Sequence, residues 1–374
     1  MLKLVNVQGG TRLGRKIRLF GVTLASALLV SACGSASSTA SSSTTKAGTP
    51  AVAASTATKL SFNANGTPNL KGLTIPIGNG AGGTYVGDTN VYDLVQYLKK
   101  WGANATQTNA SSNAGELAVA SGTLDATTGP PPAIVDGGLT IFGPNQARLD
   151  DVLIAKNSIT SLAGLKGQKV GLGPVASPDE VLFLSVLQKA KLSPSQVTTL
   201  VIGTNTAIVR ALIAGQIDAG FVPSEDVAKA GKGFHVLAVG GTILPSYADS
   251  FMGARASWLT SHPAIAEAID LAWFASAKLF NTNEAAWVKA AATYTSNVNT
   301  TAQYQAYWKD LQSIKGWPIT TDSFLSSKVI AFNMGIAKKS NALKGPGLRP
   351  IAQLYNLSAW HSAWAQFSAH ESAY

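Results

Sequence analysis

The sequence predicts an α/β protein built from two lobes, and three observations support this fold class. Short apolar runs alternate along the chain with longer segments of helical periodicity, the pattern of α/β folds. Residues 59–374 are more than a single hydrophobic core usually accommodates. A seven-residue motif occurs as Ala120–Ala126 and, 93 residues later, as Ile213–Ala219. In each copy an apolar helix ends at a glycine, which favours a left-handed helix end, and Leu-Asp-Ala or Ile-Asp-Ala opens a strand.

The composition excludes several classes of protein. Of 374 residues, 46% are hydrophobic and 13% are charged, so the chain is not a highly charged disordered one. Its single Cys excludes an intrachain disulfide framework and a cysteine-based metal site. Residues 1–32 supply +5 of the net charge of +10, and the other 24 basic and 19 acidic residues are dispersed. We therefore expect no nucleic-acid binding, which needs a clustered basic face.

The first 32 residues have the pattern of a secretion signal. A basic stretch, Arg12–Arg18, precedes the apolar run Leu19–Val30, whose 12 residues are too few for a bilayer core that takes about 20. The run ends in Leu-Val-Ser-Ala-Cys, which resembles the bacterial lipobox and implies cleavage before Cys33 and lipidation of its sulfur. We expect a lipid anchor on the extracytoplasmic face of the membrane. The alternative is an ordinary signal peptide with an incidental Cys.

Residues 33–68 are predicted to form a flexible tether. Between Gly34 and Thr58, 13 of the 25 residues are Ser or Thr, and nearly all others are Ala, Gly or Pro. Such a composition cannot bury a core, so the folded body begins after it.

The first lobe is predicted to begin with a strand over residues 73–77 and a glycine-rich loop over residues 79–85. A helix over residues 90–101 follows, because Val91, Leu94 and Leu98 share one face of it.

In the second lobe, residues 169–172 are predicted as a strand. Ser177-Pro178-Asp179-Glu180 then predicts a helix start, with a capping box and Pro at the first helical position. A strand over residues 197–202 and a helix over residues 206–214 lead into the second motif copy.

Three segments in this order carry a resemblance to a known family. They are residues 162–171, residues 211–220, and His262-Pro263 followed by an alanine-rich helix. Over roughly residues 70–315 the chain resembles substrate-binding proteins of ABC importers, of the nitrate/sulfonate/taurine and thiamine-precursor-like type. The resemblance implies a type II periplasmic-binding-protein clamshell joined by two crossing strands, one at residues 151–156 and one within residues 236–256. Lobe 1 would then comprise residues 69–155 and, with the C-terminal helices, 246–374, and lobe 2 would comprise residues 156–245.

The resemblance implies a protein that captures a small solute and delivers it to the permease and ATPase subunits of an ABC transporter. We expect a monomer without catalytic activity, cofactor or metal, and the sequence contains no Gly-x-Ser-x-Gly, His-Glu-x-x-His or P-loop motif. Sulfonates such as taurine are the first candidate solutes. A thiamine-precursor-like heterocycle or another small nitrogenous compound is the alternative, and a lipoprotein sensor or adhesin ectodomain is a further one.

Open α/β sheets bind ligands beyond the carboxyl ends of their strands, where four predicted loops lie. Two loops belong to the first lobe, and their glycines allow the backbone to approach a ligand. Their candidate ligand-binding residues are Asn79, Gly82, Gly83, Thr84 and Tyr85, followed by Thr127, Thr128 and Gly129 after the first motif copy. The alternative for both loops is a structural turn without a ligand.

The other candidates belong to the second lobe and its return crossing. Ala176 and Ser177 lie at a predicted helix start, whose N–H groups suit an anion, although Ser177 can cap those groups itself. Ser224 and Glu225 stand where many relatives have Trp-Glu-Pro. Arg255 could clamp an anion with two hydrogen bonds, and its alternative is a surface Arg.

The candidate loops lack Lys and Arg but contain Asp88, Asp179, Glu225 and Asp226. If these acids face the cleft, a zwitterion or an amine-bearing heterocycle fits better than nitrate. The alternative is that they are solvated helix caps.

Overall fold

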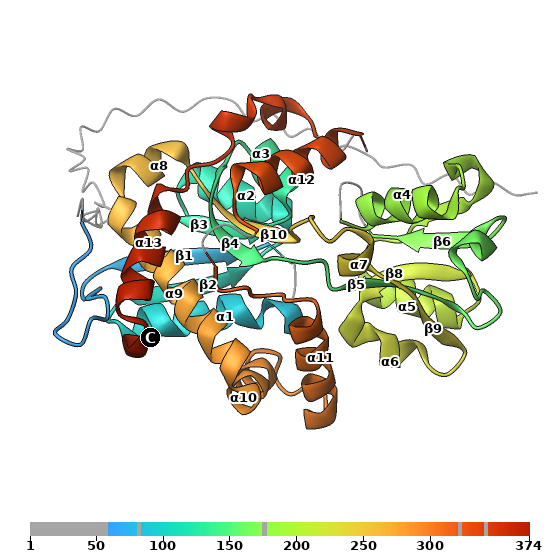
Figure 1. The fold of residues 1–374 in the computed structure, drawn as a ribbon, viewed down its shortest axis with the longest axis horizontal. Coiled ribbons are helices and arrows are strands. Elements are labelled where there is room, and N and C mark those ends of the chain that lie inside the picture. The colour runs from blue at the N-terminus through green and yellow to red at the C-terminus, as the bar shows by residue number, and fades with distance from the viewer. Residues whose placement is uncertain (1–58, 81–83, 174–177, 321–323, 340–342) are drawn as a thin grey trace, which may run out of the picture. The chain divides into compact units, whose positions relative to one another are not determined.

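The computed structural model describes residues 59–80, 84–173, 178–320, 324–339 and 343–374 (Figure 1). The described residues belong to one compact unit, in which helices surround two five-stranded sheets. The predicted α/β class with two lobes is therefore confirmed. The expectations for the signal segment, Cys33 and the tether lie outside the described residues, as do those for Gly82, Gly83, Ala176 and Ser177.

The sheet of the first lobe has the strand order β2-β1-β3-β10-β4. Strand β1 runs parallel to β2 and β3, whereas β10 runs antiparallel to β3 and β4. The strands are β1 (Thr74–Asn79), β2 (Asn104–Asn109), β3 (Ala126–Gly129), β4 (Thr140–Gln146) and β10 (Ser250–Ala254). The first strand extends past the predicted end at residue 77, because Gly78 and Asn79 continue the pairing with both neighbours.

Helices cover this sheet, and the long helix α9 is central among them. It packs against α1, α13 and β4, and most of its side chains are buried. Aromatic rings fill the contact with α13, where Phe274 stacks on Trp360 with ring centroids 4.3 Å apart. The helices are α1 (Thr89–Lys100), α2 (Ser112–Ser121), α3 (Pro131–Asp136), α8 (Ala256–Ser261), α9 (Pro263–Thr282), α10 (Glu284–Tyr294), α11 (Thr301–Ser313), α12 (Ser327–Lys339) and α13 (Ser358–Ala369).

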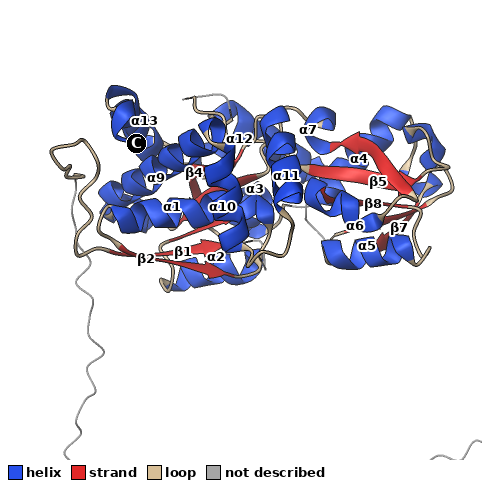
Figure 2. Cartoon of the chain, turned by 90° about the horizontal axis from the view of Figure 1, so that it is seen from below, coloured by secondary structure: helices blue, strands red, loops and turns tan. Residues whose placement is uncertain are grey.

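The sheet of the second lobe has the order β7-β6-β8-β5-β9 and is seen with its helices in Figure 2. Its strands are β5 (Asp151–Lys156), β6 (Lys169–Leu172), β7 (Thr198–Val201), β8 (Ala219–Pro223) and β9 (Phe234–Val239). Its helices are α4 (Pro178–Ala190), α5 (Asn205–Ile213), α6 (Val227–Ala230) and α7 (Gly240–Ile243). As in the first sheet, three neighbouring strands are parallel, here β7, β6 and β8. Strand β5 then runs antiparallel to both of its neighbours, β8 and β9.

The repeated motif has the same conformation in both lobes. Gly122 and Gly215, which follow α2 and α5, have φ angles of 85° and 70°. Only glycine adopts this left-handed conformation at little cost, so each helix ends there. Strands β3 and β8 then begin at Ala126 and Ala219, the last residue of each motif copy and two residues after the predicted starts at Leu124 and Ile217.

The chain passes between the two sheets twice. Residues 147–150 connect β4 to β5, and residues 244–249 connect α7 to β10. Strand β10 lies between β3 and β4, the place that β5 takes between β8 and β9 in the other sheet. Each lobe therefore receives one strand directly from a crossing segment. Among the described residues, no helix is both long enough and apolar enough to span a bilayer.

Candidate functional site

Polar side chains meet at the carboxyl ends of β1, β2 and β3, because these strands are parallel. Asn79 accepts a hydrogen bond of 3.0 Å from the hydroxyl of Thr128, and its amide donates to the hydroxyl of Tyr294 at 3.1 Å. Both Asn79 and Thr128 are buried. The Tyr294 hydroxyl in turn donates to Asn109 at 3.3 Å, and the ring of Tyr294 stacks on that of Tyr92. The edge of this sheet is thus lined by amides, hydroxyls and an aromatic pair.

The remaining first-lobe candidates take different places. Thr84 is exposed and accepts a hydrogen bond from Asn109, while Tyr85 is half-buried. Thr127 is buried, and its Oγ1 lies close to β1, since a Cβ on Gly78 would lie 2.6 Å from it. Gly129 is paired with Phe251 inside the sheet.

One side chain of the second lobe reaches the first. Glu225 lies in a single 3₁₀ turn, Ser224–Asp226, directly after β8, and its Oε2 accepts a 3.1 Å hydrogen bond from the backbone N–H of Val86. Val86 opens the 3₁₀ turn Val86–Asp88, which leads into α1. The bond therefore connects the candidate loop of the second lobe to the residue that directly follows the candidate loop over residues 79–85.

Asp150 extends the same group from the segment that connects the sheets. It accepts hydrogen bonds from the hydroxyl of Tyr307 in α11 and, at 3.1 Å, from the amide of Gln146. Gly87 passes close by, since a Cβ there would lie 3.5 Å from Asp150 Oδ2. We call Asn79, Thr128, Val86, Asp88, Asp150, Ser224 and Glu225 the interlobe site.

The carboxyl groups of the interlobe site have raised pKa values. Burial, the largest cause, raises the pKa of Asp88 to about 7 and that of Glu225 to about 8. Burial also raises the pKa of Asp150. The negative charges of Asp150 and Asp88 contribute to the raised pKa of Glu225. The site therefore disfavours further negative charge.

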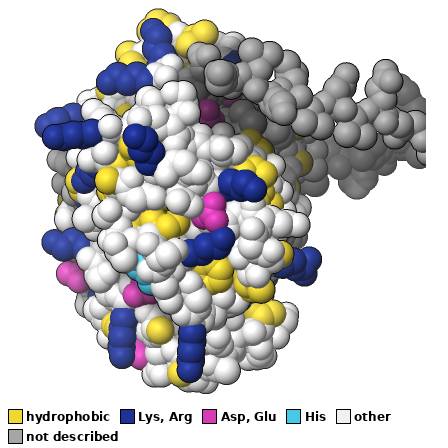
Figure 3. All heavy atoms as spheres, turned by 90° about the vertical axis from the view of Figure 1, so that its right-hand side faces the viewer, with side chains coloured by type: hydrophobic (Ala, Val, Ile, Leu, Met, Phe, Trp, Pro, Cys, Tyr) yellow, Lys and Arg dark blue, Asp and Glu magenta, His cyan; other side chains and the backbone are white. Residues whose placement is uncertain are grey.

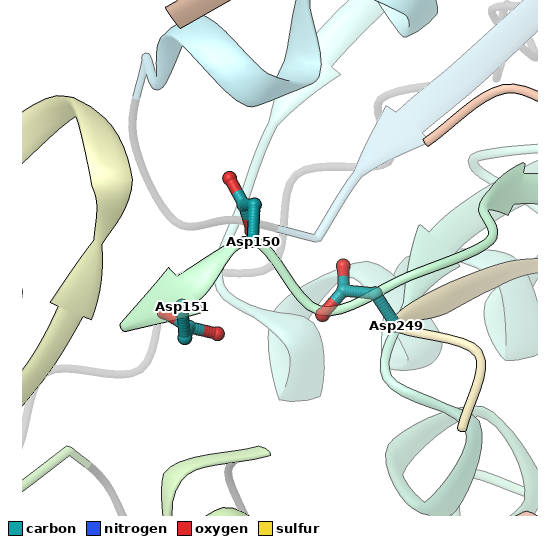
Figure 4. A group of neighbouring side chains, drawn as sticks. All are labelled: Asp150, Asp151 and Asp249. Atoms are coloured by element: carbon teal, nitrogen blue, oxygen red, sulfur yellow. The ribbon is translucent and has the colours of Figure 1, made fainter. Parts of the chain in front are cut away.

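Two more carboxyl groups lie where the connecting segments pass each other. Asp150, Asp151 and Asp249 have carboxylate oxygens within 4.8 Å of one another. Figure 4 shows the side chains of the adjacent residues Asp150 and Asp151 extending to opposite sides of the chain. Burial raises the pKa of Asp151 and Asp249 well above the usual range, and repulsion by neighbouring aspartates adds to it.

Positive charge is scarce at the interlobe site. The ammonium of Lys229 lies 2.5 Å from Asp226, and its positive charge also acts to lower the pKa of Glu225. Arg255 lies elsewhere: it follows β10, and its guanidinium donates to the carbonyl of Val119 near the end of α2. The structure therefore does not bring Arg255 to the other candidates.

Sequence reasoning missed Tyr294, Asp150 and Tyr307. Tyr294 and Tyr307 belong to helices of the C-terminal third, and only tertiary packing brings them to the strand ends. Asp150 could have been identified from the sequence, because it directly precedes the predicted crossing strand and crossing segments lie between the two lobes.

The chain is similar in fold to periplasmic binding proteins. Residues 146–279 match the family model described as NMT1/THI5 like. The nitrate-binding protein of Synechocystis PCC 6803 is 12% identical with a TM-score of 0.66, over 82% of this chain and 91% of that one. The putative sulfonate-binding protein of Methylobacillus flagellatus KT is 17% identical with a TM-score of 0.62, over 80% and 96%.

The aliphatic sulphonate binding protein of Escherichia coli gives 16% identity and a TM-score of 0.61, over 78% of this chain and 99% of that one. No curated protein matches the chain. The resemblance predicted from the sequence, and with it the type II periplasmic-binding-protein fold, is confirmed by the family match and these structures.

Proposed function

We propose that this chain is a solute-binding protein that captures a small organic solute at the interlobe site and delivers it to an ABC permease. The hydrogen bond from Val86 to Glu225 carries the proposal, because it joins the loops in which such sheets bind ligands. Hinge closure of two lobes around a solute is the established behaviour of this fold. The three similar structures are all named as binding proteins, which supports the proposal.

A sulfonate such as taurine is the first candidate solute, in line with the names of two of those proteins. The electrostatics of the site favour the second candidate, a small nitrogenous compound. Within the described part of the chain, the interlobe site contains the carboxyl groups of Asp88, Asp150 and Glu225 and no Lys or Arg.

We further propose that Cys33 is lipidated and that the serine- and threonine-rich tether attaches the folded body to the outer face of the membrane. Metabolic labelling with an alkyne-bearing fatty acid tests this proposal. The label is expected on the parent chain and absent from Cys33→Ala, whereas equal labelling of both would exclude Cys33 as the modified residue.

Thermal unfolding in the presence of candidate solutes tests capture. A ligand that binds only the folded state stabilises it by about 2.7 kcal/mol at a hundredfold excess over Kd. A panel of alkanesulfonates, taurine, nitrate, aminopyrimidines and small amines is expected to give a concentration-dependent rise in Tm with one chemical class. No rise with any of them would contradict capture and favour a sensor or adhesin.

A further inference from the structure

A cavity of about 210 Å³ adjoins the interlobe site. Asp150 and Ser224 belong to both, and Val152, Val227 and Val239 supply an apolar wall. The cavity ends near α11, where Asp310 and Ser313 are exposed. Sites for drug-sized ligands usually enclose about 300–1,000 Å³, so this cavity suits a smaller solute.

Two oxygens at this place are enclosed but make no hydrogen bond of normal length. They are Oδ2 of Asp88 and the hydroxyl oxygen of Ser224, whose hydroxyl interacts with the carboxyl group of Asp310. A buried polar atom without a partner costs about 1–3 kcal/mol, so both oxygens are suited to a ligand that donates hydrogen bonds or carries positive charge.

In the second lobe, basic side chains lie mainly on the outer surface, and several acidic side chains are buried or half-buried. Lys and Arg side chains are spread over the outer face seen in Figure 3, among few acidic ones. Six Lys and Arg side chains of the second lobe are exposed: Lys166, Lys169, Lys189, Lys191, Arg210 and Lys232. By contrast, Asp179 and Asp226 are buried and Glu225 is half-buried at the interlobe site. The outer bases are thus separate from the acids that meet the first lobe.

The acids of the interlobe site come from three parts of the chain. Asp88 belongs to the first lobe, Asp150 to the connecting segment, and Glu225 to the second lobe. None of the ion pairs between described residues involves any of these three carboxyl groups. A positive charge placed among them would favour the ionised form of all three carboxyl groups, because charges interact more strongly in a partly enclosed environment than in water.

We propose that the solute is a small organic ammonium compound whose charged group lies among Asp88, Asp150 and Glu225 and whose apolar part occupies the adjoining cavity. This inference rests on the proposed function and specifies its solute. The apolar body packs against Val152, Val227 and Val239. A sulfonate would instead place its negative charge beside three carboxyl groups, none of which forms an ion pair with another described residue.

A pair of probes of nearly equal shape tests the role of charge. Choline carries a quaternary ammonium group, and 3,3-dimethylbutan-1-ol has a carbon atom in place of the nitrogen. Isothermal titration of the full chain with choline, n-butylammonium, 3,3-dimethylbutan-1-ol and propanesulfonate is expected to show binding of at least one ammonium compound. The neutral alcohol is expected to bind at least tenfold more weakly than choline, or not at all.

Carboxamide variants then locate the site. Asp88→Asn and Glu225→Gln are each expected to weaken ammonium binding at least tenfold, because each removes a carboxyl group that can ionise beside the ammonium group and keeps the side-chain size. Glu371→Gln is the matched control, since Glu371 is exposed and lies at the far C-terminus, 3.8 Å from Lys278. Its affinity is expected to stay unchanged. The probe comparison on the parent chain remains decisive if a variant does not fold.

The outcomes separate this inference from the proposed function. Binding of propanesulfonate without binding of either ammonium compound would overturn the inference and leave solute capture standing. Equal binding of choline and its neutral isostere, or unchanged affinity in both carboxamide variants, would also overturn it. Failure of every probe here and of the full panel above would overturn both.

Discussion

The side-chain oxygen of Glu225 accepts a 3.1 Å hydrogen bond from the backbone N–H of Val86, which lies 139 residues earlier in the chain. The bond joins the end of β8 in the second lobe to the start of the turn that precedes α1 in the first. It is a direct contact between one loop predicted to bind the ligand and the residue that directly follows another such loop, residues 79–85.

Replacing Glu225 by Ala is expected to expose the amide of Val86. Without its acceptor the N–H is free to exchange, so hydrogen exchange at Val86 should accelerate at least tenfold. Glu225→Gln keeps a side-chain oxygen and is expected to retain most of the protection. Equal exchange in the parent and the Ala variant, measured by NMR or mass spectrometry, would show that the bond does not persist in solution.

The pKa of Glu225 makes a prediction about pH. Burial raises this pKa to about 8, whereas an unfolded Glu titrates near 4.3. The protonated carboxyl group of Glu225 makes its full contribution to the stability of the folded protein below about pH 4.3. This contribution is lost as the pH rises toward 8, because in that range the unfolded state releases the proton and the folded state keeps it. The slope for one such group is at most about 1.4 kcal/mol per pH unit.

Glu225→Gln removes this proton and should therefore become more stable relative to the parent between pH 5 and pH 8. Urea unfolding at three pH values measures the difference in the free energy of unfolding. A difference that stays constant across this range would mean that the carboxyl group titrates normally in the folded protein.

A side chain at position 87 is expected to clash with the hydroxyl group of Tyr307. A Cβ at this position would lie 2.9 Å from the Tyr307 hydroxyl oxygen and 3.5 Å from Asp150 Oδ2. Gly87→Ala should therefore cost about 1–3 kcal/mol of stability, the usual range for overpacking. In a double-mutant cycle with Tyr307→Phe, the double variant should lose less than the sum of the two single losses. Additive losses would contradict the close approach.

Arg255 is expected to act on stability rather than on solute affinity. Its guanidinium donates to the Val119 carbonyl close to the end of α2, and hydrogen bonds to charged groups contribute about 1.5–3 kcal/mol. Arg255→Ala should lower the free energy of unfolding by about that amount and leave the Kd for the solute unchanged. A large rise in Kd without a loss of stability would restore Arg255 as a ligand residue.

Much of the fold was predictable because the strands and helices have clear apolar periodicity and the repeated motif marks one helix end and one strand start in each lobe. The strand end at Asn79 was predicted two residues early, since Gly78 and Asn79 have no apolar side chain. Their place in β1 comes from pairing with β2 and β3, which only the assembled sheet provides.

The candidate site was predictable where parallel strands end, and Asn79, Thr128 and Glu225 meet their partners there. Arg255 is a candidate because it lies near the predicted return crossing, where an Arg could clamp an anion. The strand before it, β10, runs antiparallel to β3, with Ala254 opposite Ala126, so Arg255 emerges at the other edge of the sheet. Strand direction depends on tertiary topology, which the local pattern of residues does not contain.

The position of β10 between β3 and β4 has a consequence for synthesis on the ribosome. The strands β5 to β9 of the second sheet are all translated before β10, whereas the first sheet lacks a central strand until β10 emerges. Chains generally fold from the N-terminus as domains emerge. The sheet of the second lobe can therefore be complete before that of the first lobe, although its strands are translated later. Until residues 250–254 are translated, β3 of the first lobe has an unpaired edge.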